Sequence, residues 1–296
     1  MLIPLFILSL PATGVSAGPA NAPLAFLHPR SNDVFYQERD EYFINVLRLA
    51  LQKSGEPFTL DTVLLSPMSE KRSKLFLKSQ RYNVHWLLTN EELEEDLIPI
   101  RVPLYKGLIG WRLLVVHENN ADVFANITTL SELKPYKATQ GLGWPDTIIL
   151  ESAGLSLRPA VDWTGLMEIM TRQQAEYMPL ALNEVWWVKQ SLNDRQLMIE
   201  DHLILQYPSA YYFFVSKNLP EHARLLEKGM QAAVNDGSFT ELFMRTFGDG
   251  IRRSNLQDRT IFSLNNPLLP RRTPVADKRL WFKVEDLESP TAQVSR

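Results

Sequence analysis

The chain has 296 residues, of which 45% are hydrophobic and 22% charged, a composition typical of a globular protein large enough for two lobes. Its net charge of -3 and the spread of its 31 Lys and Arg along the chain leave no basic patch, so nucleic acid is not expected as a partner. The absence of cysteine excludes disulfides, thiolate metal sites and a cysteine nucleophile.

The first residues resemble a secretory signal peptide. The apolar run from Leu2 to Leu10 is too short to span a bilayer, and Pro11 ends it. The small residues at 15–17 would permit cleavage after Ala17, so residues 1–17 are predicted to be removed. Because no cysteine is available for a lipid anchor, the mature chain is expected to be exported to the periplasm as a soluble protein.

The next part of the chain alternates between helical and extended patterns. Residues 40–53 place their apolar side chains on one helical face, and residues 58–64 alternate as a strand does. A polar helix is expected around 69–80, then a strand at 84–88 and a long apolar stretch at 111–116. This order predicts one α/β group.

A second α/β group begins near Leu130, and strands alternating with helices of this length favour parallel sheets covered on both faces. The tail from Asn255 onward is rich in proline and irregular. The remaining predicted elements are strands at 137–140, 156–160, 175–178 and 207–216, and helices at 145–153, 162–175, 182–190, 221–235 and 238–247.

Several segments are similar to those of a known family. The order of export signal, α/β group, "GLIGWRLLVV", second α/β group, "YYFFVS" and C-terminal helices resembles type 2 periplasmic solute-binding proteins. The segments "GWPDTIILESAGL", "EYMPLALNEVW", "YPSAYYFFVS" and "NNPLLP" are similar to a subgroup of transporter substrate-binding-like proteins whose ligand is generally unassigned. The resemblance covers roughly residues 24–282.

This resemblance implies an α/β, two-lobed type 2 periplasmic-binding-protein fold with two crossover strands, near 108–116 and 208–215. It also implies that the first lobe is discontinuous in sequence. The implied segments are lobe 1 at 22–109 and 212–282, lobe 2 at 110–211, and a tail at 283–296.

The resemblance further implies non-catalytic capture of a small polar or anionic solute by lobe closure, in a monomer without cofactors. The solute would pass to an ABC transporter permease or a membrane sensor. The alternative is a dehydratase-like periplasmic enzyme on the same fold, for which Glu184 is the one acid/base candidate.

One motif departs from the family pattern. Amino-acid-binding members typically carry Thr-x-x-Arg after the third strand, where the Arg holds the ligand's carboxylate in a bidentate fork. Here Glu92 stands three residues after Thr89. Any such cation must come from elsewhere, and Arg101, Lys106 and Arg112 at the first crossover are the nearest candidates.

The turn "QGLGWPD" at 140–146 is the predicted wall of the second lobe. A glycine-loosened backbone feeding a helix N-terminus offers N–H groups to a polar or anionic ligand, and Trp144 offers an aromatic face. The alternative is a tight strand-to-helix turn that binds nothing. The other candidate ligand-binding residues, mostly at strand ends, are Trp86, Thr89, Gln140, Asn183, Glu184, Tyr207 and Tyr211. Core packing is expected instead for Trp186, Trp187 and Tyr212.

Three other readings are less favoured. The acidic run at 91–96 is interpreted as a solvated helix face rather than a catalytic pair. The five histidines never fall at i, i+3 or i+4 with one another, so their spacing predicts no metal site. Gly141-Leu-Gly143, with Asp162 further on, imitates a dinucleotide fingerprint, but Asp146 replaces its third glycine.

Overall fold

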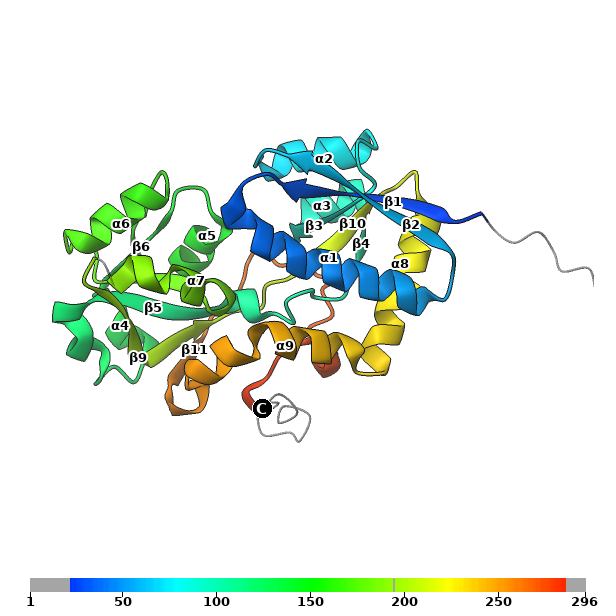
Figure 1. Ribbon diagram of the computed structural model, residues 1–296. Helices are drawn as coiled ribbons and strands as arrows, with labels where there is room; N and C mark the ends of the chain where they lie inside the picture. The colour runs from blue at the N-terminus through cyan, green and yellow to red at the C-terminus, as the bar shows by residue number, and fades with distance from the viewer. Residues whose placement is uncertain (1–21, 194, 286–296) are drawn as a thin grey trace, which may run out of the picture.

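The computed structural model describes residues 22–193 and 195–285, which fold into two α/β lobes joined by several segments of chain (Figure 1). The first lobe draws its elements from both ends of the described chain, and the second draws them mostly from the middle. The α/β fold class predicted from the sequence is confirmed.

The first lobe contains two small sheets. Its elements are β1 (Leu24–Ser31), α1 (Val34–Ser54), β2 (Phe58–Leu65), α2 (Glu70–Lys78), β3 (Val84–Leu88), α3 (Glu91–Asp96), β4 (Leu97–Ile100), β10 (Tyr211–Ser216) and α8 (Pro220–Asn235). β1 pairs in parallel with β2, whereas β10 lies between β3 and β4 and is antiparallel to both.

Asn83 links these two sheets. Its side-chain Oδ1 accepts from the N–H of Leu27 at 2.8 Å, and its Nδ2 donates to the carbonyl of Ala25 at 2.7 Å. The backbone N–H of Asn83 donates to the carbonyl of Leu27 at 2.9 Å. β1 and β3 therefore lie side by side, with one asparagine satisfying the backbone groups between them.

The second lobe is built on one mixed sheet of six strands, in the order β11-β9-β5-β8-β6-β7. Its elements are β5 (Trp111–His117), α4 (Leu130–Leu133), β6 (Lys137–Gly141), α5 (Pro145–Ser152), β7 (Ser156–Ala160), α6 (Trp163–Thr171), β8 (Tyr177–Ala181), α7 (Leu182–Asn193), β9 (Leu197–Gln206) and β11 (Thr260–Ser263). The sequence predicted a parallel sheet, but this sheet is mixed, because β5 is antiparallel to both β8 and β9.

The strand pattern in the sequence misses β9, because acidic residues interrupt its apolar run. Glu200 is buried, accepts hydrogen bonds from the N–H groups of His202 and Leu203 at 2.7 Å each, and pairs with the guanidinium of Arg259 at 3.4 Å. A buried, paired carboxylate can occupy a strand that looks too polar in the sequence.

The chain crosses between the lobes at 101–110 and returns at 207–210. The expected crossover strands overlap β5 and β10, but each of these strands lies within one lobe, and the residues that cross lie between strands. The two crossings touch where the N–H of Tyr207 donates to the carbonyl of Gly110 at 3.1 Å. A Cβ at Gly110 would lie 1.9 Å from the carbonyl oxygen of Tyr207, so only glycine permits this approach.

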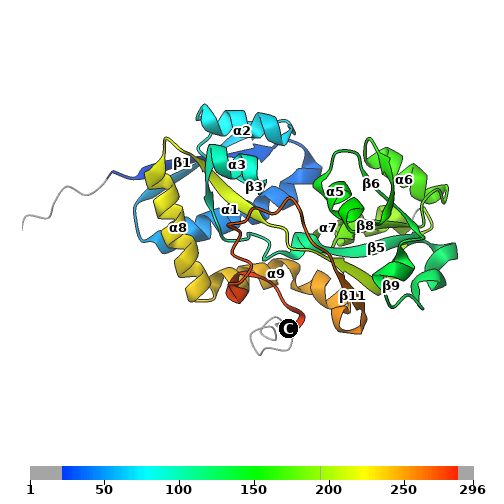
Figure 2. The ribbon, with the colours of Figure 1, turned by 180° about the vertical axis from the view of Figure 1, so that it is seen from behind.

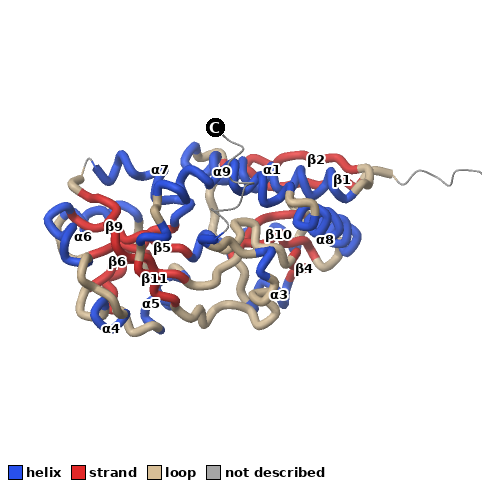
Figure 3. Tube along the Cα trace, turned by 90° about the horizontal axis from the view of Figure 1, so that it is seen from below, coloured by secondary structure: helices blue, strands red, loops and turns tan. Residues whose placement is uncertain are grey.

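The C-terminal part of the chain joins the lobes again. Helix α9 (Ser238–Arg253) packs against α1, α8 and α7, and β11 then pairs with β9 (Figures 1 and 2). The assignment of 212–282 to the first lobe is therefore corrected for β11. The segment 264–282, which we call the C-terminal strap, runs back beside the crossings, where Asn266 donates to the carbonyl of Pro208 at 2.9 Å. Figure 3 shows these loop segments between the lobes.

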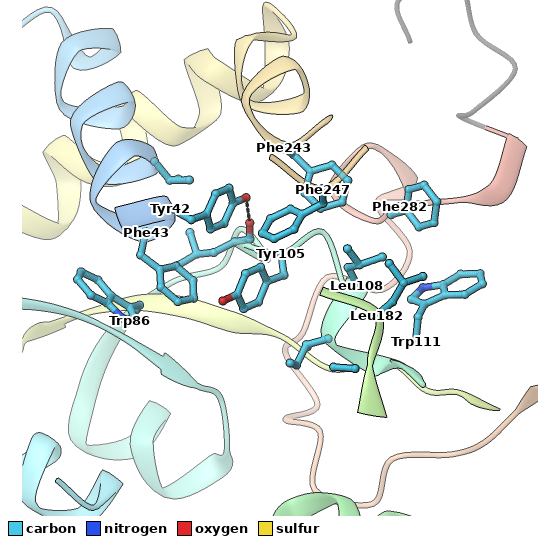
Figure 4. Packing of buried hydrophobic residues seen from close by; sticks show 14 of the residues in the cluster. Tyr42, Phe43, Trp86, Tyr105, Leu108, Trp111, Leu182, Phe243, Phe247 and Phe282 are labelled. Carbon is cyan, nitrogen blue, oxygen red and sulfur yellow. Dashed lines mark hydrogen bonds between the residues drawn. The ribbon is translucent and has the colours of Figure 1, made fainter. Parts of the chain in front are cut away.

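An aromatic cluster forms the core where α1, β3, the first crossing and α9 meet (Figure 4). The Phe43 ring centroid lies 5.2 Å from that of Trp86 and 4.8 Å from that of Tyr105, and the hydroxyl of Tyr42 donates to the carbonyl of Leu104 at 2.5 Å. Trp86, expected at the ligand site, is buried here.

None of the helices in residues 22–193 and 195–285 is long and apolar enough to cross a membrane. The predicted signal peptide at 1–17 lies outside the described residues.

Candidate solute-binding site

A cavity of about 770 Å³ lies between the two lobes. The first lobe contributes polar side chains from α1, α2 and the ends of β3 and β10, and the second lobe contributes residues from β5, α5, α6 and α7. The C-terminal strap closes one side with Asn266, Leu268 and Leu269. Of the ten candidate ligand-binding residues, the four that line this cavity are Thr89, Trp144, Glu184 and Tyr211.

The glycine turn before α5 places Trp144 at the cavity. A Cβ at Gly141 would lie 2.2 Å from the indole ring of Trp144, and Gly143 has a φ of +77°, so both glycines are needed for this turn. Trp144 occupies the N-cap position of α5 without a side-chain hydrogen bond to the helix, and Pro145 takes the first helical position. The Thr147 hydroxyl donates to the carbonyl of Gly141 at 2.8 Å. The indole remains 38% exposed, on the cavity wall.

Asp146, in the first turn of α5, forms a buried ion pair with Arg112 of β5 and accepts a hydrogen bond from the hydroxyl of Tyr207. The guanidinium of Arg112 lies 5.5 Å from the ring centroid of Tyr207. Burial disfavours the charged guanidinium, but the attraction of Asp146, Tyr207 and Glu184 outweighs it and raises the pKa of Arg112. The helix N-terminus expected to face an anionic ligand is thus already occupied by a carboxylate of the chain.

Glu184 lies in the first turn of α7, half-buried on the cavity wall. Among the described residues its carboxylate has no hydrogen bond or ion pair. The net effect of its surroundings is to raise the pKa of Glu184. Burial is the main cause and Asp146 adds to it, whereas Arg112 and Arg39 act in the opposite direction.

Arg39 of α1 is the cation of the first-lobe wall, and the sequence analysis missed it. Its guanidinium lies 3.4 Å from the buried carboxylate of Asp40. The signal that could have found it is the charged pair Arg39-Asp40 at the start of an otherwise apolar helical face.

Arg101 and Lys106, the expected crossover cations, do not line the cavity. Arg101 donates two hydrogen bonds to Glu94, at 3.1 and 2.5 Å, and Thr89 donates to the same carboxylate at 2.9 Å. Lys106 donates to the carbonyl of Arg279 at 2.6 Å. The crossover cation at the cavity is Arg112 instead.

Three other candidate ligand-binding residues lie inside the second lobe or at its edge and do not line the cavity. Gln140 is fully buried and donates to the carbonyl of Pro179 at 3.1 Å, which ties β6 to β8. Asn183 is buried beside Glu184, and neither of its amide atoms has a hydrogen-bond partner in the described residues. Tyr207 belongs to the Arg112–Asp146 cluster rather than to the cavity wall.

Of the three aromatic residues expected to pack in the core, two do so and one does not. Tyr212 is fully buried and Trp186 packs against the core, as predicted. Trp187 is 42% exposed and lines the cavity, so core packing is wrong for it.

The acidic run is only in part the predicted solvated face, because Glu91, Glu92 and Glu95 are exposed whereas the Glu94 side chain is buried. Helix α3 carries it, and its carboxylates pair with Lys74, Lys78 and Arg101. Asp162 caps α6 by accepting from the N–H of Gly165 at 2.8 Å. Within residues 22–193 and 195–285, no group of three or more His, Asp or Glu is placed to hold a metal ion.

A smaller cavity of about 200 Å³ lies in the first lobe and shares Arg39 with the larger one. His85 of β3 lines it, and the buried Nδ1 of this side chain has no hydrogen-bond partner within residues 22–193 and 195–285. Burial, with contributions from Arg39 and His28, lowers the pKa of His85 from 6.5 to about 3.

We expect His85 to make the fold sensitive to acid. Unfolded His85 takes up a proton below pH 6.5, whereas folded His85 stays neutral until about pH 3, so stability falls as pH falls through this window. Urea unfolding at pH 7 and pH 5 should show a smaller loss in His85→Gln than in wild type. The exposed His202→Gln serves as the control, and an equal loss in all three proteins would contradict the assignment.

The sequence matches no protein-family model and no curated protein. Solved structures share its fold. A probable amino-acid ABC transporter extracellular-binding protein from Bacillus subtilis is similar with a TM-score of 0.58 and 13% identity, over 77% of this chain and 99% of that chain. An ancestral arginine-binding protein bound to arginine is similar with a TM-score of 0.51 and 16% identity, over 77% of this chain and 100% of that chain.

The BvgS VFT2 domain of Bordetella pertussis is similar with a TM-score of 0.54 and 15% identity, over 75% of this chain and 93% of that chain. Identities this low establish the fold alone. The chain has the two-lobed fold of type 2 periplasmic binding proteins, as the sequence resemblance predicted.

Proposed function

We propose that this protein captures a small polar solute between its lobes and closes around it. The observation that carries the proposal is the cavity of about 770 Å³, whose walls come from both lobes and which lies beside the crossings that join them. Small-molecule sites are typically concave, largely apolar clefts of about 300–1,000 Å³ with a few convergent polar groups. Hinge closure around a ligand is a usual motion of two-lobed binding proteins.

We further propose that the protein works in the periplasm and passes its solute to an ABC transporter or to a membrane sensor. The similar structures include a probable transporter binding protein and a BvgS domain, which supports both kinds of partner. A permease and an ATPase encoded beside this chain would favour the transporter.

Trp144→Ala should weaken solute binding roughly tenfold, because it removes an exposed aromatic face from the cavity wall. A thermal-shift screen of small solutes identifies a binder, since a ligand that binds only the folded state raises the melting temperature. Titration of that binder by calorimetry then compares wild type with the variant. The matched control is Ile261→Ala, a similarly exposed apolar residue outside the cavity.

Equal affinity of wild type and Trp144→Ala for the binder would mean that Trp144 does not contact the solute. The second candidate function is catalysis, favoured by the carboxyl of Glu184, which lines the cavity without a hydrogen bond or ion pair among the described residues and whose pKa is raised by burial. Incubating each binder with the protein and analysing the mixture by mass spectrometry tests it. A new product that forms with wild type and not with Glu184→Gln would support the enzyme.

A further inference from the structure

Carboxylates outnumber basic groups on the wall of the interlobe cavity. Four acidic residues line it, against two arginines, and no lysine or histidine is among the described residues of the wall. The acidic residues are Asp33, Glu70, Asp146 and Glu184. The wall therefore carries an excess of negative charge, and such an excess in a low-dielectric cleft favours a cation.

Both arginines of the wall already face acids. Arg112 pairs with Asp146, in a contact where their side chains are 8% and 14% exposed, and Arg39 lies beside Asp40. An anionic ligand would therefore have to compete with a carboxylate of the protein for either guanidinium. The anionic end expected from the sequence is not favoured by this arrangement.

Glu184 is different, because it faces the cavity with no partner among the described residues. When lobe closure excludes water from this half-buried carboxylate, a hydrogen-bond donor supplied by the ligand would satisfy it. Its first-lobe counterpart Glu70 instead accepts from the side chain of Asn90 at 2.7 Å.

Aromatic side chains also line the cavity. Trp187 lies three residues after Glu184 on α7, so the two side chains are neighbours on one helix face. Trp144, Trp163 and Tyr211 also line the cavity. Indole faces attract ammonium and guanidinium groups through their quadrupoles, most strongly where water is excluded.

We propose that the solute is an organic cation whose ammonium or guanidinium group is held by the Glu184 carboxylate and by the faces of Trp144 and Trp187. This inference rests on the proposed function and names its ligand class. It assigns Glu184 as the counter-ion of the ligand rather than as a general acid or base.

The test uses probes in matched sets. Agmatine, phenethylammonium and choline are titrated by calorimetry, together with their carboxylate-bearing counterparts arginine, 3-phenylpropionate and betaine. At least one cation should bind, and at least tenfold tighter than its counterpart. Glu184→Gln should weaken that cation ten- to hundredfold, since it removes the negative charge that attracts the cation and, for agmatine or phenethylammonium, a charge-assisted hydrogen bond as well. The control Glu151→Gln, on an exposed face of α5, should change nothing.

The melting temperature of each variant without ligand reports whether it is folded, and Glu184→Asp provides a second variant that keeps the charge and should retain part of the affinity. A carboxylate-bearing counterpart that binds more tightly than its cation overturns the inference. So does failure of all three cations when the thermal-shift screen finds a neutral or anionic binder, although the proposed function then stands. If neither screen finds a binder, the proposed function itself falls.

Discussion

Replacing Arg112 by alanine should lower the free energy of unfolding by about 3–5 kcal/mol, because it leaves the Asp146 carboxylate buried without its counter-ion. The guanidinium also packs over the ring of Tyr207, so the variant loses contacts with the second crossing as well. Urea unfolding measures the loss. We expect a lower transition midpoint with an unchanged slope.

A double-mutant cycle isolates the ion pair in this prediction. The cycle compares Arg112→Met, Asp146→Leu and the double variant. The double variant removes both charges and keeps most of the apolar volume, so it should be more stable than Arg112→Met alone. If Arg112→Ala costs less than about 1 kcal/mol, Arg112 and Asp146 do not form a buried ion pair.

Phe43→Ala should lower the free energy of unfolding by a similar amount, about 3–5 kcal/mol, because it opens a cavity in the aromatic cluster of Figure 4. The ring of Phe43 contacts Trp86, Tyr105 and Tyr211, and the last of these lines the interlobe cavity. The variant should therefore also bind solute less tightly.

Phe43→Leu is the control for the loss of stability. Leucine refills most of the space, so this variant should lower the free energy of unfolding by less than about 1.5 kcal/mol. Thermal and urea unfolding of both variants decide the matter. Equal stability of Phe43→Ala and wild type would mean that this cluster does not hold α1 against the crossings.

Local patterns predicted most of the fold. Helices α5 and α8 and strand β7 lie within one residue of their expected bounds, because proline starts, glycine ends and apolar spacing mark them clearly. The sequence pattern missed β9 because its buried Glu200 is satisfied by Arg259, a residue far along the chain. No local pattern reports such a distant partner.

The candidate site was predicted less completely. The sequence indicated Trp144 and Glu184, which both line the cavity, because a Gly-Leu-Gly-Trp-Pro turn and a helix start are local features. Arg101 is positively charged and lies near the crossover, but its side chain pairs with Glu94 and does not line the cavity. Arg39 does line the cavity, although it lies in a helix whose sequence suggests only a packing role. Which of two nearby cations faces a cleft depends on tertiary partners.

The position of the C-terminal strap also depends on tertiary contacts that no local sequence pattern indicates. Leu268 and Leu269 lie in a proline-rich tail that reads as irregular, yet they line the cavity. Their position follows from the hydrogen bond between Asn266 and Pro208, which holds the strap against the second crossing.

Lobe closure around a solute is tested most directly by small-angle X-ray scattering of the protein with and without a saturating concentration of its tightest binder. The solute-capture account predicts that the radius of gyration decreases when the binder is added to wild type, and decreases less at the same concentration in Trp144→Ala. A radius of gyration that does not change in wild type at saturation would contradict capture by closure of the two lobes.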